Sequence, residues 1–161
     1  MGSGKSTVGE ALAFRLGLKF IDIDREVEKQ TGVTIATIFE IEGEKGFRII
    51  EKELLNKLLK QEKIVIATGG GAILDMGNRR AIHSSGYVIY LRAQPATLIR
   101  RLANDKTRPL LKKDAPEETI RAILKERSNL YEATAHLTLD VDAATPKCVV
   151  RKIEVSISKW K

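Results

Sequence analysis

The first seven residues, Met1-Gly2-Ser3-Gly4-Lys5-Ser6-Thr7, contain most of a phosphate-binding loop. The full pattern is G-x-x-x-x-G-K-[ST], and the sequence matches it from the third position onward. In such a loop the backbone N–H groups surround an anion, the lysine reaches the β- and γ-phosphates, and the serine hydroxyl binds Mg²⁺. The helical pattern of residues 8–16 would direct a positive helix end at the same phosphates. Gly-Lys-Ser also occurs in ordinary loops, so the rest of the chain must decide.

The remaining sequence alternates short apolar segments with amphipathic ones, which predicts an α/β fold with a mainly parallel sheet. A chain of 161 residues corresponds to one domain, here residues 1–161. Residues 104–116 are rich in Lys, Arg and Pro and are expected to form a basic lid. The expected strands are 19–22, 64–67, 87–91 and 136–141. The expected helices are 8–16, 24–30, 78–84, 95–102, 116–131 and one from Pro146. A further helical stretch runs from 34 to about 58, with an interruption at Gly43 and Gly46.

One expected element is absent from the sequence. A phosphate-binding loop normally joins a buried strand to a helix, and here no strand precedes Met1. We therefore expect a parallel sheet that lacks its central strand, and a start of the chain that is truncated or misassigned.

Composition restricts the possible partners. The net charge of +7 and pI near 9.6 fit either nucleic-acid binding or an enzyme with anionic substrates. Aromatic residues make up only 5% and the basic residues are scattered, which favours the enzyme. Cys148 is the only cysteine, and His83 and His136 are predicted to be structural or surface residues, so no metal-ligand cluster of Cys and His is expected. With no long apolar run and no signal-peptide pattern, we expect a cytoplasmic protein without a membrane segment.

Two carboxylates, Asp22 and Asp24, follow the first expected strand. On an extended backbone, residues two apart point to the same face, and strand ends in such folds are where ligands bind. One carboxylate could then serve Mg²⁺ while the other accepts a hydroxyl proton. The alternative is that Asp24 is only the N-cap of the next helix.

The strand at 64–67 is followed by Gly69-Gly70-Gly71. Three glycines in a row cost backbone entropy, which indicates that the backbone closely approaches a substrate, although a tight turn would also explain them. No carboxylate ends this strand or follows Leu91. Any metal site is therefore expected at Ser6 and Asp22.

Three arginines interrupt apolar or proline-containing segments. Arg127 lies on the helix face that carries Ile120 and Ile123, where a guanidinium needs an anionic partner. It could equally extend from the edge of the core to solvent. Arg48 adjoins Phe47, and its alternatives are a pair with Glu51 within the helix or simple surface exposure. Arg108 in the basic segment could reach a transferred phosphate if that segment closes, or could simply be solvated.

Together these residues resemble the shikimate kinase family, in family order and over essentially the whole chain. The residues that carry the resemblance are Gly2-Ser3-Gly4-Lys5-Ser6-Thr7, Asp22-Ile23-Asp24, Ile38-Phe39, Gly43-Glu44, Gly46-Phe47-Arg48, Thr68-Gly69-Gly70-Gly71, Arg108-Pro109-Leu110-Leu111 and Arg127 with Leu130-Tyr131. The resemblance implies ATP-dependent phosphorylation of the 3-hydroxyl of shikimate. It also implies a P-loop three-layer α/β/α fold with strand order 2-3-1-4-5, of which strand 1 is missing from this sequence.

The resemblance also implies roles for single residues. Asp24 would be the catalytic base and would bind the shikimate hydroxyls, with Lys5 and Arg108 as further catalytic residues. Ser6 and Asp22 would hold Mg²⁺, and Arg48 and Arg127 would bind the shikimate carboxylate. The substrate pocket would be lined by Gly69, Gly70 and Gly71.

For ATP, the resemblance implies contacts from residues 2–7 and Arg108, with adenine between Arg101 and Pro146. The implied partners are ATP and shikimate, bound by a monomer that takes neither nucleic acid nor membrane as partner. Two alternatives stay open: another small-molecule P-loop kinase, such as a gluconate kinase, and a non-catalytic nucleotide-binding protein of kinase-like fold. The first would not need Arg48 and Arg127 to converge, and the second is favoured by the missing strand and the basic pI.

Overall fold

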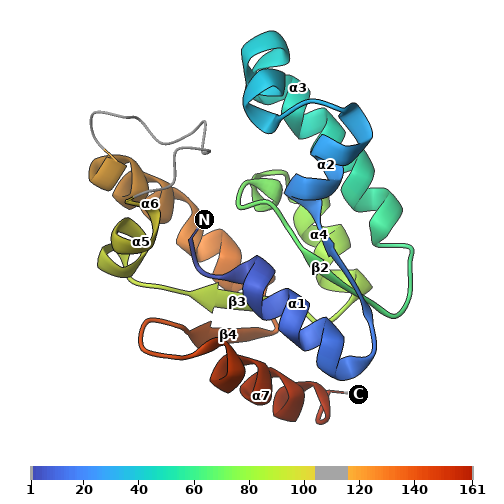
Figure 1. Cartoon of the computed structure of the whole chain (residues 1–161), viewed down its shortest axis with the longest axis vertical. Helices are drawn as coiled ribbons and strands as arrows, with labels where there is room; N and C mark the ends of the chain where they lie inside the picture. The colour runs from blue at the N-terminus through green and yellow to red at the C-terminus, as the bar shows by residue number, and fades with distance from the viewer. Residues whose placement is uncertain (1, 104–115, 161) are drawn as a thin grey trace.

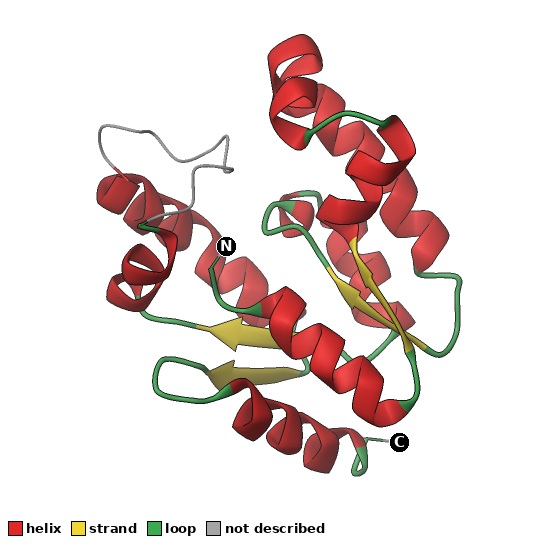
Figure 2. Ribbon diagram, viewed as in Figure 1, coloured by secondary structure: helices red, strands yellow, loops and turns green. Residues whose placement is uncertain are grey.

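A computed structural model describes residues 2–103 and 116–160 of the chain. The strands form two parallel pairs, which Figure 2 shows in yellow. Strand β1 (Lys19–Asp22) pairs with β2 (Ile64–Ala67), and β3 (Ile89–Arg92) pairs with β4 (Leu137–Asp140). Among the described residues, no ladder joins β2 to β3. This agrees with the expected order, in which the strand before the phosphate-binding loop would lie between the two pairs.

Seven α-helices and one short 3-10 helix connect and flank these strands in the described part of the chain. Helix α1 packs against α7 and against the β1–β2 pair, whereas α6 packs against α4, α5 and η1 (Figure 1). The bounds of the helices are α1 Lys5–Leu16, α2 Ile23–Thr31, α3 Ile35–Leu58, η1 Ala72–Leu74, α4 Met76–Ser85, α5 Pro95–Leu102, α6 Pro116–Thr134 and α7 Pro146–Ile157. The parallel strands and flanking helices confirm the predicted α/β fold.

Local signals in the sequence explain where most helices begin and end. Thr34, Asp75 and Thr145 cap α3, α4 and α7, each accepting a hydrogen bond from the backbone N–H three residues later. Left-handed glycines end α1 at Gly17 and α2 at Gly32. Within α3, Gly43 has φ 70° and interrupts the helix, as the sequence predicts, whereas Gly46 lies inside regular helix.

The apolar side chains form two cores, one beside each strand pair. One core contains buried residues of α1, β3, α5, α6 and α7, and Val65 of β2 packs against it. The other contains buried residues of β1, α2, α3, η1 and α4, and Ile64 and Ile66 pack against that one. Helix α1 and strand β2 therefore connect the two halves, and the candidate site residues come from both.

Two predicted strands differ at their ends from the structure. Strand β3 begins at Ile89 rather than at residue 87, where the Val88 N–H donates to the His136 ring instead of to a strand partner and the Tyr87 hydroxyl lies 2.6 Å from Ser156 Oγ of α7. Strand β4 covers Leu137–Asp140 rather than 136–141. The predicted basic lid at 104–116 lies outside the described residues, apart from the start of α6 at Pro116.

The two histidines, distant in the sequence, stack on each other with ring centroids 4.2 Å apart. His83 Nδ1 lies 3.0 Å from the Thr134 carbonyl oxygen, and His136 Nδ1 accepts a hydrogen bond of 3.1 Å from the Val88 N–H. Their role here is structural, since they join α4 to the starts of β3 and β4. No described helix has the length and apolar content needed to cross a membrane.

Candidate active site

The phosphate-binding loop has the alternating backbone geometry of an anion nest. Gly2 and Gly4 have φ values of 69° and 90°, and Ser3 between them has a negative φ. Gly4 is the N-cap of α1, so the positive end of this helix begins at Lys5. Lys5 and Ser6 are half-buried, whereas Thr7 is exposed. The loop and the helix start therefore have the backbone geometry that suits an anion, and phosphate binding here stays a prediction.

Ser6 and Asp22, the predicted metal ligands, lie in direct contact. The Ser6 hydroxyl donates a 2.5 Å hydrogen bond to Asp22 Oδ2. Asp22 Oδ1 accepts from the backbone N–H groups of Asp24 and Arg25, at 3.0 and 3.4 Å. Asp22 therefore links the start of α1 to the start of α2.

The expectation that Asp22 and Asp24 share one face of an extended strand is wrong. Helix α2 begins at Ile23, so Asp24 belongs to its first turn. The helix starts there because Asp22, rather than Asp24, is the N-cap and binds the first N–H groups. The alternative interpretation of Asp24 as the cap is thereby also wrong.

The glycine loop packs tightly against charged side chains. A methyl group at position 69 would overlap the Glu51 carboxylate and lie 3.1 Å from Asp24 Oδ1, and one at position 71 would overlap the Arg48 guanidinium. The same loop follows β2, whose Ala67 pairs with Asp22 of β1. The glycines thus let the backbone approach Asp24, Glu51 and Arg48 more closely than any side chain would allow.

Arg48 lies between two carboxylates of its own helix, so the predicted pair with Glu51 exists. Its Nη1 donates to Glu51 Oε2 at 2.7 Å, and its Nη2 donates to Glu44 Oε1 at 2.8 Å. Glu51 is completely buried, and this burial raises the pKa of its carboxyl although Arg48 opposes the shift. Because the Arg48 side chain remains 23% exposed, its outer part can still meet a ligand.

From the opposite side, α6 directs Arg127 and Tyr131 at the same glycine loop. Arg127 is 7% exposed, which excludes the alternative of a guanidinium extended into solvent. Its Nη1 lies 3.4 Å from the Gly70 carbonyl oxygen, which also accepts a 2.5 Å hydrogen bond from the Tyr131 hydroxyl. Arg48 and Arg127 therefore reach neighbouring residues of one loop.

Of the residues predicted to bind adenine, Arg101 lies beside the phosphate-binding loop. It donates to the Gly2 carbonyl at 3.4 Å and to the Val141 carbonyl at 2.9 Å. Pro146 is exposed at the start of α7, five residues after Val141. Arg108 lies outside the described residues.

The sequence interpretation missed the importance of Glu51 and Tyr131. Glu51 falls on the buried face of α3 with Phe47, Leu54 and Leu58, so a carboxylate within an apolar stripe was the available signal. Tyr131 follows Arg127 by one helical turn, which places both side chains on the same face of α6.

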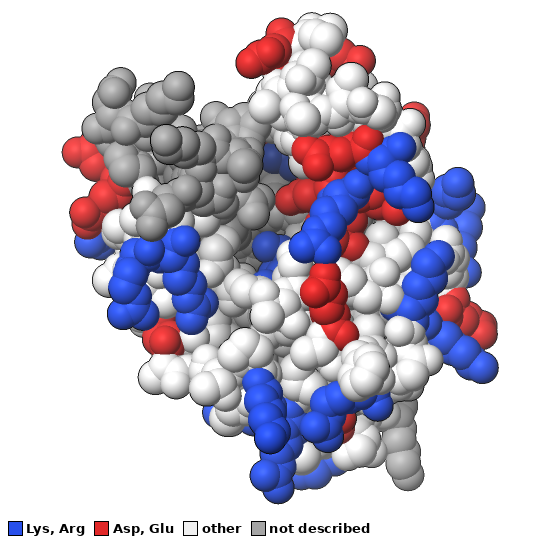
Figure 3. Space-filling view, in the orientation of Figure 1, with Lys and Arg blue, Asp and Glu red and all other residues white. Residues whose placement is uncertain are grey.

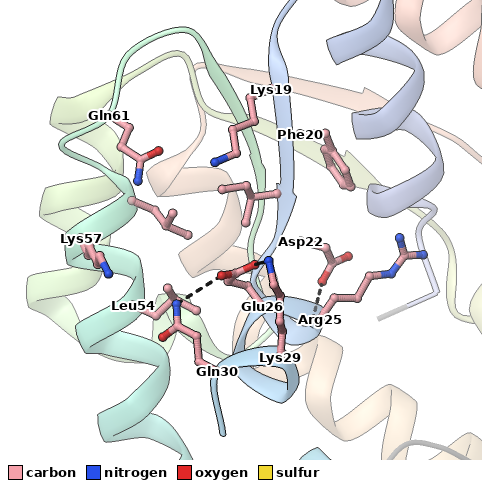
Figure 4. Close-up of a pocket in the computed structure, with 12 residues that line it drawn as sticks. Lys19, Phe20, Asp22, Arg25, Glu26, Lys29, Gln30, Leu54, Lys57 and Gln61 are labelled. Carbon is pink, nitrogen blue, oxygen red and sulfur yellow. Dashed lines mark hydrogen bonds and ion pairs between the residues drawn. The ribbon is translucent and has the colours of Figure 1, made fainter. Parts of the chain in front are cut away.

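A cavity of about 370 Å³ lies beside β1 and is drawn in Figure 4. Its wall includes Lys19 and Ile21 of β1 and side chains of α2 and α3 such as Lys29 and Lys57. Of the predicted site residues only Asp22 borders it. The chemistry described above lies elsewhere, and we place the candidate site at the glycine loop.

The donor set fits one Mg²⁺ ion bound together with phosphates. Mg²⁺ usually keeps several waters and takes only one or two protein ligands besides phosphate oxygens. Ser6 Oγ and Asp22 Oδ2 provide such a pair at the start of α1. Within residues 2–103 and 116–160, no group of three or more acidic, His or Cys side chains could hold a metal by itself.

Comparison with known proteins identifies the family of this chain. The family model described as shikimate kinase matches residues 1–158. The chain is 42% identical over 160 residues to the shikimate kinase of Aromatoleum aromaticum, covering 99% of this chain and 91% of the relative. It is 48% identical over 140 residues to that of Burkholderia thailandensis, covering 87% and 76%.

Solved structures agree as well. Shikimate kinase from Acinetobacter baumannii in complex with shikimate has a TM-score of 0.95 and 42% identity, and the match covers 100% of this chain and 91% of that one. The enzyme from Bacteroides thetaiotaomicron has a TM-score of 0.90 and 31% identity, with coverage of 98% and 94%. These matches agree with the phosphate-binding loop and with the glycine loop and its two arginines. They show that the chain belongs to the shikimate kinase family.

Proposed function

We propose that this chain transfers the γ-phosphoryl group of ATP to the 3-hydroxyl of shikimate, with the glycine loop and the residues around it as the acceptor site. The observation that carries the proposal is the convergence of Asp24, Arg48 and Arg127 on Gly69–Gly71. Two guanidinium groups suit a carboxylate, and one carboxylate suits hydroxyl groups. Shikimate carries both, and a relative in this family has been solved in complex with it.

Two buried polar atoms at this site support an anionic, hydroxylated ligand. Arg127 Nε and Glu51 Oε1 have no hydrogen-bond partner among the described residues, although Glu126 lies 3.5 Å from Arg127 Nε as an ion pair. Buried polar atoms are normally paired, and an unpaired one is costly. A ligand carboxylate would supply an acceptor for Arg127, and a ligand hydroxyl could donate to Glu51.

On the nucleotide side, we assign the phosphates to residues 2–7, with Lys5 beside the β- and γ-phosphates. Ser6 and Asp22 would hold Mg²⁺, which neutralises phosphate charge when bound. We further assign Arg101 and Pro146 to adenine, and Arg108 to the transferred phosphoryl group. These side chains position the phosphoryl group and stabilise its charge, which are the main demands of phosphoryl transfer.

Asp24 would orient the 3-hydroxyl and accept its proton as the oxygen attacks phosphorus. Asp24 lies in the first turn of α2, where its backbone N–H binds Asp22 and its carboxylate lies beside Gly69. A base at this place faces the acceptor rather than the nucleotide. We also propose that the protein acts as a cytoplasmic monomer that binds neither nucleic acid nor membrane.

The test is phosphoryl transfer by this chain to shikimate, gluconate and nucleoside monophosphates, followed by mass spectrometry of the product. We expect shikimate 3-phosphate alone. Asp24→Asn should lower turnover by about 10²- to 10⁴-fold while the ATP dissociation constant stays nearly unchanged. Glu62→Gln, at an exposed carboxylate, serves as the control. Phosphorylation of gluconate instead would identify another small-molecule kinase, and an equal loss of ATP affinity in Asp24→Asn would contradict the role of Asp24.

A further inference from the structure

We infer that Tyr131 is a positioning residue for the acceptor carboxylate, because its hydroxyl makes the shorter bond to the Gly70 carbonyl and so keeps Arg127 from binding that oxygen more closely. This inference rests on the proposed function. It concerns three groups: the Tyr131 hydroxyl, the Arg127 guanidinium and the carbonyl oxygen that they share.

The two donors do not share that oxygen equally. Tyr131 binds the Gly70 oxygen at 2.5 Å, whereas Arg127 Nη1 is 3.4 Å away, near the limit of a hydrogen bond. Arg127 Nε has no hydrogen-bond acceptor among the described residues. The buried guanidinium is therefore held near the loop but keeps donors that a ligand carboxylate can engage.

The Tyr131 ring is fixed in the orientation that this bond requires. It stacks on Tyr90 of β3 with ring centroids 5.0 Å apart and an angle of 22° between the planes. Burial raises the pKa of the Tyr131 phenol, although the charge of Arg127 and its side-chain hydrogen bond to Tyr131 oppose the shift, so the group remains a proton donor at neutral pH. A fixed, protonated phenol supplies the Gly70 carbonyl with a short hydrogen bond and loses no further side-chain entropy when substrate binds.

Without the hydroxyl, Gly70 would be left with Arg127 as its remaining side-chain donor. A half-buried carbonyl that loses its partner favours the nearest donor, and the guanidinium is already 3.4 Å away. Substrate would then compete with a protein carbonyl for Arg127. The same loss would loosen the loop whose neighbouring residue, Gly71, lies against Arg48.

The decisive variant is Tyr131→Phe, which keeps the ring and its stacking partner, with Tyr90→Phe as the matched control on the other ring. We expect the KM and the calorimetric dissociation constant for shikimate to rise about tenfold in Tyr131→Phe, with the KM for ATP unchanged. Tyr90→Phe should leave all these values close to those of the unmodified chain. Equal shikimate affinity in both variants would overturn the inference.

A second measurement separates positioning from general weakening of the fold. With an analogue in which the shikimate carboxylate is replaced by a hydroxymethyl group, Tyr131→Phe and the unmodified chain should bind alike. In an Arg127→Ala background, Tyr131→Phe should add little further loss. An equal loss for shikimate and for the analogue would refute the inference while leaving the proposed function intact. If the unmodified chain neither binds nor phosphorylates shikimate, the proposed function itself fails and the inference fails with it.

Discussion

Replacing Gly71 by alanine tests directly whether Arg48 belongs to the acceptor site. The backbone at Gly71 has φ −101° and ψ −6°, which an alanine can adopt. The added methyl group, however, would overlap the guanidinium of Arg48, to which its three nearest atoms all belong. The substitution therefore displaces the end of one arginine without imposing backbone strain.

The expected magnitude follows from what Arg48 would give up. It donates to Glu51 at 2.7 Å and to Glu44 at 2.8 Å, and hydrogen bonds to charged groups contribute about 1.5 to 3 kcal/mol each. Complete loss would leave the buried Glu51 unpaired at a cost of about 3 to 5 kcal/mol, but a flexible side chain that is 23% exposed can shift partway. A displaced guanidinium would also lose its charge-assisted hydrogen bond to the shikimate carboxylate, so we expect about 1.5 to 3 kcal/mol less shikimate binding energy, or about a 10- to 150-fold rise in KM.

Stability should fall as well, because the bonds from Arg48 to Glu51 and Glu44 weaken when the guanidinium shifts. Overpacking costs about 1 to 3 kcal/mol, and replacing glycine by alanine returns about 0.4 to 1 kcal/mol by restricting the unfolded chain. The free energy of unfolding should thus fall by about 1 to 2 kcal/mol, with the KM for ATP unchanged. The control is Gly86→Ala, because Gly86 is extended at φ 179° and a methyl group there has nothing within 4 Å. A folded Gly71→Ala variant with the same shikimate KM as Gly86→Ala would refute the placement of Arg48.

Two further changes probe the metal pair and the stacked histidines. Ser6→Ala removes the donor to Asp22 and should raise the Mg²⁺ concentration needed for half-maximal turnover by about 10- to 100-fold. Ser84→Ala, at an exposed hydroxyl of α4, should leave that concentration unchanged, and equal effects of the two changes would contradict the metal assignment. The pKa of His136 is lowered below its usual 6.5, mainly by desolvation and also by the charge of the facing His83. At a pH just below 6.5, the folded state therefore binds fewer protons than the unfolded state. The stability that depends on a neutral His136 should be present above pH 6.5 and be lost as the pH falls through the folded-state pKa. The other rings in contact with His136 are Tyr87 and Trp160. Thermal unfolding from pH 5 to 8 should therefore show a shallower slope for His136→Asn, which cannot titrate, and an unchanged slope would exclude His136 as the source.

The elements of the fold were largely predictable because their signals are local. Caps such as Thr34 and Asp75, and the left-handed glycines at positions 17 and 32, act within a few residues of the helix ends that they set. The ends of β3 and β4 were less predictable because they depend on distant partners. Tyr87 turns toward Ser156, a contact across 69 residues that no local pattern reveals.

The identities of the site residues came partly from motifs, but their contacts did not. The short Ser6–Asp22 bond and the placement of Arg127 and Tyr131 on Gly70 join residues separated by 16, 57 and 61 positions. Residue type and spacing suggested that Arg127 faces inward, yet they gave no means of choosing its partner. The glycine loop illustrates the same limit, since its closeness to Glu51 and Arg48 depends on how α3 lies against the loop and the η1 turn that follows it.

The wrong expectation about Asp22 and Asp24 is instructive because one carboxylate explains it. A strand that continued through residue 24 would have directed both side chains to one face. Instead Asp22 Oδ1 binds the first N–H groups of α2, which turns the chain into a helix at Ile23, while Oδ2 accepts from Ser6. The two oxygens thereby fix the start of α2 relative to the start of α1. Since Asp24 is carried by that first turn, the distance between the phosphate-binding loop and the proposed base depends on the Asp22 side chain.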